Sequence, residues 1–160
     1  MRKILIAIDG SEGASKAVDY AGKQFTGISD LQITLYHVSP GVPPELWDDG
    51  HILNEEEKAA RRKVLDKWLA NQQAKIESVF QPAIESLTQR GINPKQIETK
   101  SVSESVKNTA ECILAEAKAG GYQTLIMGRC GASATAHALM GSIANKITSR
   151  GAGIAVCLVG

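Results

Sequence analysis

Short apolar runs alternate along the chain with longer segments in which apolar residues recur every three or four positions. Such runs, bounded by glycine, proline or acidic residues, are typical of strands buried on both faces of a sheet. Four of them predict strands at 3–8, 31–38, 124–127 and 154–159, and a weaker alternation predicts another at 96–102. Strands and helices that alternate throughout predict an α/β fold: an open five-stranded parallel sheet with helices on both faces.

Two helices are expected in the N-terminal half. Ser11 can cap the first, which Gly27 ends, and Asn54 can cap a long second helix that runs to residues 90–91. Pro82 falls inside this second helix. Because proline lacks the backbone N–H and clashes with the preceding turn, we expect it to kink the helix or divide it in two.

Two more helices are expected in the C-terminal half. Ser103 or Ser105 can cap the third, which residues 120–121 end. Residues 134–149 have a mostly helical pattern, but Gly141 and Ser142 interrupt it, so we expect the final helix to begin there with Ser142 as its cap.

No repeat or linker divides the chain, so we expect residues 1–160 to form a single domain. Ligands of open α/β sheets bind beyond the carboxyl ends of the strands, where the strand order reverses. The residues that follow the predicted strands there are Asp9, Val38, Val102 and Gly128. The long loop at 39–53 could close over a ligand or join an interface.

Composition narrows the possible partners. A net charge of +1 leaves no broad electrostatic footprint for nucleic acid or an anionic membrane, and 4% aromatic residues predict an aliphatic core. Three widely spaced cysteines, Cys112, Cys130 and Cys157, match neither a disulfide framework nor a metal site. With no leader-like or membrane-spanning segment in the pattern, we expect a cytoplasmic protein.

The strongest indication of a ligand-binding site comes from glycines in the C-terminal part of the chain. Gly128 and Gly131 directly follow a predicted strand, and Gly141 with Ser142 stands where a helix should begin. Glycine lets the backbone approach a ligand closely, and a helix N-terminus offers unpaired N–H groups to an anion. A phosphate cradle and a pair of plain turns are equally compatible with this spacing.

The pattern G-x2-G-x9-G-[S/T], here from Gly128 to Ser142, resembles the nucleotide-binding signature of the universal stress protein family. The first strand with its turn at 9–11, residues 35–38 and the last strand at 154–159 also resemble that family. The resemblance therefore spans the whole chain. It implies a Rossmann-like fold that binds ATP or AMP.

The resemblance assigns the nucleoside to the ends of three strands. Asp9 would contact the nucleoside near the adenine or the ribose. The backbone at Ala7 and Val38 would frame the adenine, and Met127 and Gly128 would line the ribose side. A carboxylate at a strand end can also cap a turn, but it suits ribose hydroxyls or an adenine amine as hydrogen-bond donors.

The same resemblance assigns the phosphates to the glycine turns. Gly131, Gly141 and Ser142 would hold them, with the backbone of Ile143 beside them. Family members often carry basic residues between the last two turns, whereas this chain has only His137 there. Neutralising a triphosphate would then rest on Arg129, helix N–H groups and a divalent cation (Mg²⁺ or Mn²⁺), so AMP stays open as the ligand beside ATP.

An enzyme is the main alternative class. The chain contains no P-loop, no G-x-S-x-G elbow and no Ser-Gly-Gly-x-Asp-Ser loop, and His37, His51 and His137 lack metal-ligand spacing. We therefore name no catalytic residue and leave slow ATP hydrolysis as an alternative. Cys130 beside Arg129 could serve as a redox sensor, although a small residue in a turn is the simpler interpretation.

An interaction module is the third class. The charged run at 55–63 is most simply a solvated helix face, with Glu55/Lys58 and Glu57/Arg61 spaced for pairing. The apolar strand at 154–159 would leave an exposed sheet edge, and the family resemblance implies a homodimer through it. We thus expect a homodimeric protein that binds adenine nucleotides and acts in regulation or the stress response.

Overall fold

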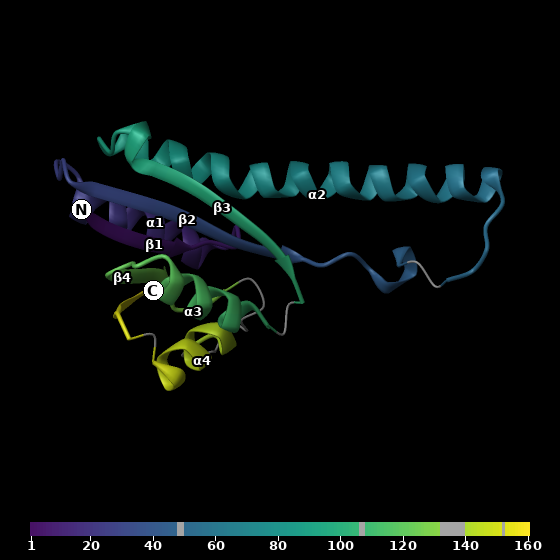
Figure 1. The fold of residues 1–160 in the computed structure, drawn as a ribbon. Coiled ribbons are helices and arrows are strands. Elements are labelled where there is room, and N and C mark those ends of the chain that lie inside the picture. The colour runs from purple at the N-terminus through teal and green to yellow at the C-terminus, as the bar shows by residue number, and fades with distance from the viewer. Residues whose placement is uncertain (48–49, 106–107, 132–139, 152) are drawn as a thin grey trace.

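The computed structural model describes residues 1–160 except 48–49, 106–107, 132–139 and 152 (Figure 1). Its strands are β1 (Arg2–Ala7), β2 (Leu31–Pro40), β3 (Ile97–Glu104), β4 (Thr124–Gly128) and β5 (Ala155–Val159). Its α-helices are α1 (Glu12–Phe25), α2 (Glu55–Gln89), α3 (Thr109–Ala119) and α4 (Ser142–Arg150), and 3-10 turns lie at Pro44–Leu46 and Pro94–Gln96. The predicted alternation of strands and helices is confirmed.

All five strands form one parallel sheet in the order β3-β2-β1-β4-β5. The chain steps outward from β1 to β2 and β3, then returns to the other side of β1 to form β4 and β5. The strand order therefore reverses between β1 and β4. The connections that leave these two strands diverge there, and this opens a crevice at their carboxyl ends.

The two faces of the sheet carry two separate apolar layers. Ile4, Ile6 and Ile8 pack on one face with residues of α1 and α2. Leu5 and Ala7 pack on the other face with residues of α3 and α4. Successive side chains of a strand point to opposite faces, which explains why an uninterrupted apolar run lies at the centre of the sheet.

Helix α2 is a single helix of 35 residues. Asn54 caps it as predicted: its side chain accepts from the Glu57 N–H, while the Glu57 carboxylate accepts from the Asn54 N–H. The helix continues through Pro82, so the prediction that this proline divides it is wrong. Pro82 is exposed, and water can reach the carbonyl group that its missing N–H leaves unpaired.

The predicted cap of α3 is also wrong. Ser103 belongs to β3, where it pairs with Ser39 of β2 and donates to the Pro40 carbonyl over 3.0 Å. Ser105 precedes the helix, whose N-cap is Asn108. The sheet thus extends further than the sequence pattern indicates, because pairing with the long strand β2 stabilises the end of β3.

The predicted start of the last helix is confirmed, since α4 begins at Ser142. Its N-cap is Gly141, however, which has no side chain to cap the helix, and Ser142 is the first helical residue. The helical pattern expected over 134–139 lies outside the described residues. Among the residues that are described, no helix is long and apolar enough to span a membrane.

Candidate functional site

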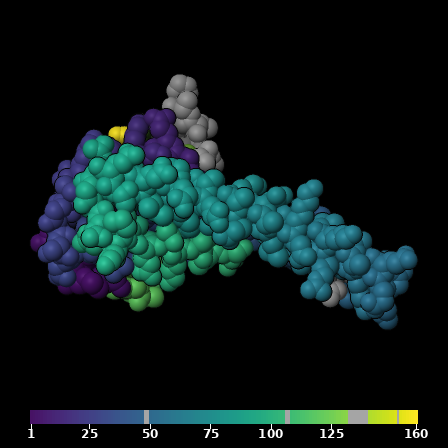
Figure 2. Space-filling model, turned by 90° about the horizontal axis from the view of Figure 1, so that it is seen from above, coloured from purple at the N-terminus to yellow at the C-terminus, as the bar shows by residue number. Residues whose placement is uncertain are grey.

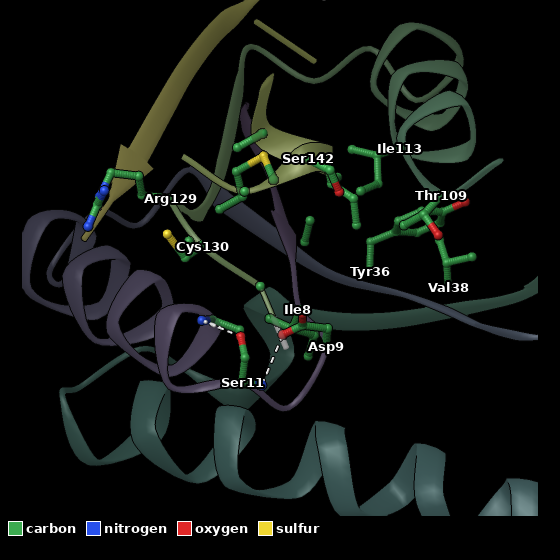
Figure 3. A pocket seen from close by; sticks show the side chains of 18 residues that line it. Ile8, Asp9, Ser11, Tyr36, Val38, Thr109, Ile113, Arg129, Cys130 and Ser142 are labelled. Atoms are coloured by element: carbon green, nitrogen blue, oxygen red, sulfur yellow. Dashed lines mark hydrogen bonds between the residues drawn. The ribbon is translucent and has the colours of Figure 1, made fainter. Parts of the chain in front are cut away.

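A cavity of about 610 Å³, counted to its opening into solvent, lies in the crevice between β1 and β4 (Figure 3). The residues predicted for the site all line it: Ala7, Asp9, Val38, Met127, Gly128, Arg129, Gly131, Gly141, Ser142 and Ile143. The fold therefore brings together residues from four separate parts of the chain.

The turn after β1 presents a carboxylate to this cavity. One oxygen of Asp9 accepts a hydrogen bond from the Ser11 N–H over 2.9 Å, as Figure 3 shows. The Ser11 hydroxyl in turn accepts from the Ala14 N–H over 3.2 Å and caps α1. Because these bonds hold the turn, the exposed Asp9 carboxylate stands at the mouth of the cavity as a fixed hydrogen-bond acceptor.

Two glycines allow the first turn of α1 to lie directly against the end of β4. A Cβ on Gly128 would lie 2.6 Å from the carbonyl carbon of Gly13, and a Cβ on Gly13 would overlap the Cys130 carbonyl oxygen. Both contacts are with backbone atoms, which cannot swing aside. Gly13 therefore shapes the site, although the sequence analysis gave it no role, and a glycine inside a helix was the signal that could have found it.

The glycines after β4 allow close packing on the side of the cavity across from the turn after β1. A Cβ on Gly131 would lie 2.9 Å from the second carboxylate oxygen of Asp9. The Gly141 N–H donates to the Arg129 carbonyl over 2.8 Å, which places the start of α4 beside the end of β4. The first N–H groups of an α-helix have no partner within it, so this wall offers donors and a positive dipole end to an anion.

The middle of the cavity is apolar. Val38, Tyr36 and Met127 line it from the sheet, and Ile113 lines it from α3. Tyr36 is buried, its hydroxyl donates to the Cys112 carbonyl over 3.5 Å, and burial raises its pKa to about 12. The phenol therefore stays neutral at physiological pH, and this part of the wall carries no charge.

Sequence reasoning missed eight other residues that line the cavity. They are Ile8, Ser11, Ala14, Tyr36, Thr109, Ile113, Cys130 and Ala144. Thr109 and Ile113 come from α3, and only the packing of that helix on the sheet brings them to the site. Val102, which was predicted to follow a strand, lies within β3 and lines a separate groove between β3 and α3.

Comparison with known proteins identifies the family. The sequence profile described as the universal stress protein family matches residues 1–152, most of the chain. This chain belongs to the universal stress protein family. A comparison with curated protein sequences finds no match.

Solved structures of other universal stress proteins share the fold of this one. One, in complex with cAMP, is 20% identical with a TM-score of 0.65, and the match covers 99% of this chain and 97% of that one. Another, from Archaeoglobus fulgidus in complex with dAMP, is 15% identical with a TM-score of 0.58 and coverages of 100% and 98%. UspA from Lactobacillus plantarum is 15% identical with a TM-score of 0.61 and coverages of 99% and 97%.

Arg129 is placed differently from its predicted use. Its backbone N–H donates to the Val159 carbonyl over 2.7 Å, and its guanidinium lies beside Gly160 at the end of β5. Figure 3 shows the side chain pointing away from Asp9 and Ser142. His137, the other cation expected near the phosphates, lies outside the described residues.

The remaining candidate groups of this universal stress protein lie elsewhere or are structural. His37 makes a 2.9 Å hydrogen bond between its Nδ1 and the Ile8 carbonyl, and its ring packs edge-on against Phe80. Across the described part of the chain, no three His, Cys, Asp or Glu side chains are grouped to hold a metal. The three cysteines, Cys112, Cys130 and Cys157, form no disulfide and are partly exposed.

Proposed function

We propose that this universal stress protein binds an adenine nucleotide, ATP or AMP, in the cavity between β1 and β4. The observation that carries the proposal is the combination of groups around the cavity: a carboxylate, an apolar wall and the N-terminus of α4. These match a sugar or base donor, a flat base and a phosphate. Complexes of two structural neighbours with cAMP and dAMP support the same ligand class.

The nucleoside would lie across the ends of β1, β2 and β4. Asp9 would accept hydrogen bonds from ribose hydroxyls or the adenine amine, and the backbone at Ala7 and Val38 would frame the base. Met127 and Gly128 would lie along the ribose. An apolar slot with few polar groups that fix orientation is the usual composition of a small-molecule site.

The phosphates would bind at the start of α4. The N–H groups at Gly131 and Ile143 and the Ser142 hydroxyl would donate to the phosphate oxygens. Gly141, whose own N–H donates to the Arg129 carbonyl, would let the phosphates approach the backbone closely. Arg129 would need another side-chain rotamer to join them. Asp9 is the one carboxylate in the described cavity wall, so Mg²⁺ or Mn²⁺ would be held mainly by a triphosphate itself.

We further propose that nucleotide occupancy regulates the protein in the cytoplasm, as a stress-response protein, rather than feeding a turnover reaction. The described cavity wall contains no histidine and only one carboxylate, which supplies no acid–base pair for hydrolysis. The ligand would lie between the turn after β1 and the start of α4 and would stiffen both. Residues 1–160 would act as a single nucleotide-binding domain.

A homodimer through β5 completes the proposal. The Ala155 N–H donates to the Gln123 carbonyl, and the Val159 carbonyl accepts from Arg129, so alternate residues of β5 pair with the β4 side. The backbone groups of Val156 and Leu158 therefore point to the open edge of the sheet. This edge strand is short and apolar, and a second copy could pair with it.

Calorimetric titration with ATP and AMP, with and without Mg²⁺, tests nucleotide binding. We expect wild-type protein to bind at least one of them and Gly131→Val to lose binding while keeping its thermal unfolding transition, because the valine would push against the Asp9 carboxylate. Gly41→Val is the matched control, since a Cβ there meets only an atom at 3.9 Å. No heat from wild-type protein at millimolar nucleotide would refute the proposal.

A further inference from the structure

The N-terminal part of α2 extends beyond the sheet, and the segment that leads into the helix lies beside its first turns. Leu46 and residues 51–53 line a groove there with residues of α2, Arg61 among them. Figures 1 and 2 show α2 projecting well beyond the sheet. No residue of α2 before Phe80 is buried, and Ile76 is the first that packs against the apolar core. We call residues 55–75 the arm. Most of the stability of helices in proteins comes from the packing of one face, so a partner that covers one side of the arm would stabilise it.

One face of the arm has a regular spacing. Glu57, Arg61, Val64, Trp68, Asn71 and Lys75 are separated alternately by four and three residues. Side chains at this spacing form a narrow stripe along one side of a helix, as in a coiled coil. Val64 is 54% exposed and Trp68 is partly exposed, although both are large and apolar.

This stripe is symmetric about Asp66. Val64 and Trp68 lie two positions to either side of Asp66, and Glu57 and Lys75 lie nine positions to either side. Glu57 and Lys75 are thus about five full turns apart at 3.6 residues per turn, so their side chains leave the helix in the same direction. Under a two-fold axis at Asp66, each residue would meet a chemically complementary one.

We propose that the arms of two copies of this chain pair antiparallel about a two-fold axis at Asp66. Val64 packs against the partner's Trp68 at the centre, and Glu57 forms an ion pair with the partner's Lys75 at each end. Arg61 faces the partner's Asn71, a hydrogen-bond acceptor. Each contact occurs twice, as an isologous interface requires.

The charged side chains of the arm are compatible with a second copy of this chain as the partner. Glu57 accepts the Asn54 N–H through Oε2, which leaves Oε1 for a second donor. Lys75 is exposed, and it makes no ion pair with the part of the chain that the structure describes. A sequence that is complementary to itself under two-fold rotation specifies a second copy, since a different partner would impose no such symmetry.

The arm interface is separate from both the cavity and β5. None of its residues lines the cavity or belongs to β5. If β5 also pairs, the protein has two independent association steps, and arm pairing joins two β5 dimers into larger assemblies. Pairing of the arms therefore does not depend on nucleotide binding or on the β5 dimer.

Sedimentation velocity over a concentration series, at low salt, tests the arm interface. Glu57→Lys and Lys75→Glu, each alone, put like charges opposite each other at both ends, and the double variant restores opposite charges. Glu77→Lys and Lys63→Glu are matched controls, because both side chains are exposed and leave the helix on other sides. Each variant is measured twice: in an otherwise wild-type chain, and in a chain that also carries Leu158→Pro, which would prevent pairing through the β5 edge.

We expect each single variant to raise the dissociation constant of the arm step about tenfold, and the double variant to return it close to wild type. Loss of the Asn54–Glu57 capping box cannot explain that recovery, because the double variant lacks it too. The controls should match wild type. Two results would overturn the proposal. One is a Leu158→Pro protein with an unchanged arm that shows no association step, and the other is a double variant that associates as weakly as the single variants.

Discussion

At the scale of single residues, glycines shape the cavity because they have no side chain, which lets backbone segments lie close together. Gly13 and Gly128 touch through their backbones, and this contact brings the start of α1 to the end of β4. Gly131 leaves room for the Asp9 carboxylate in the same way. The glycines after β4 were predicted because they stand at a strand end. Gly13 was not, because its partner is more than a hundred residues away in the sequence.

Gly13→Ala should therefore weaken nucleotide binding. The added methyl overlaps a backbone carbonyl, and overpacking of this kind costs about 1–3 kcal/mol, more than the gain of up to about 1 kcal/mol from replacing glycine by alanine in a helix. We expect a lower melting temperature and an affinity for ATP or AMP reduced about tenfold by the displaced α1 turn.

Gly22→Ala is the matched control in the same helix. Its added methyl meets the Arg90 side chain, the nearest atom at 2.9 Å, and that chain can move. Displacing Arg90 disturbs its ion pair with Asp19, so we expect a loss of stability but unchanged affinity. Equal losses of affinity in the two variants would show that the contact between α1 and β4 does not position the cavity.

At the scale of whole elements, local patterns predicted most helices and strands, and tertiary contacts set several of their ends. The buried run of β1, the Ser11 and Asn54 caps and the start of α4 all follow from neighbouring residues. β3 instead extends to Glu104 because β2 pairs with it that far. Ser103 could not be placed correctly from a capping pattern alone.

Helices α1 and α2 are joined by a charge cluster with a predictable pH dependence. The Asp19 carboxylate bonds Lys23 over 2.7 Å and also pairs with Arg90. The hydrogen bond from Lys23 and then the charge and hydrogen bond of Arg90 lower the pKa of Asp19 below its ordinary 3.8. A lowered carboxyl pKa stabilises the folded protein above that ordinary value, and this stabilisation is lost as pH falls through the folded pKa.

Asp19→Asn should thus lower the melting temperature at neutral pH, and the difference from wild type should shrink as pH falls below about 4. Thermal unfolding followed by circular dichroism across this range measures it. Glu12→Gln is the control, since its 3.3 Å pair with Lys16 lies within α1 alone and is highly exposed. A difference that persists unchanged in acid would point to a cause other than the charge of Asp19.

At the scale of the whole molecule, the sheet order decides where ligands and partners can bind. Because β1 and β4 are neighbours, Asp9 and Gly131 meet although they lie at opposite ends of the sequence. The same order leaves β5 at one edge and β3 at the other. The two edges differ: β3 is mostly exposed and polar, while β5 is apolar.

Leu158→Pro should weaken a β5 dimer without unfolding the sheet. Proline removes the N–H of Leu158, which points to the open edge, and edge strands tolerate proline at such positions. We expect sedimentation to show loss of one association step and circular dichroism to show a folded protein. Cys157→Pro is the contrast, since that N–H lies on the β4 side; we expect it to lower the melting temperature. A Leu158→Pro protein that associates like wild type would exclude β5 as the interface.

Local sequence patterns alone were enough to predict the alternation of strands and helices, the buried β1, the glycine turns and the family resemblance. These depend on periodicity and turn chemistry, which residues express within a few positions of one another. The folded structure was needed to find the contact of Gly13 with β4, the contribution of α3 to the cavity, the direction of Arg129 and the projection of the arm. Each of these depends on how separate elements pack, and distant parts of a chain leave no local pattern that records their contact.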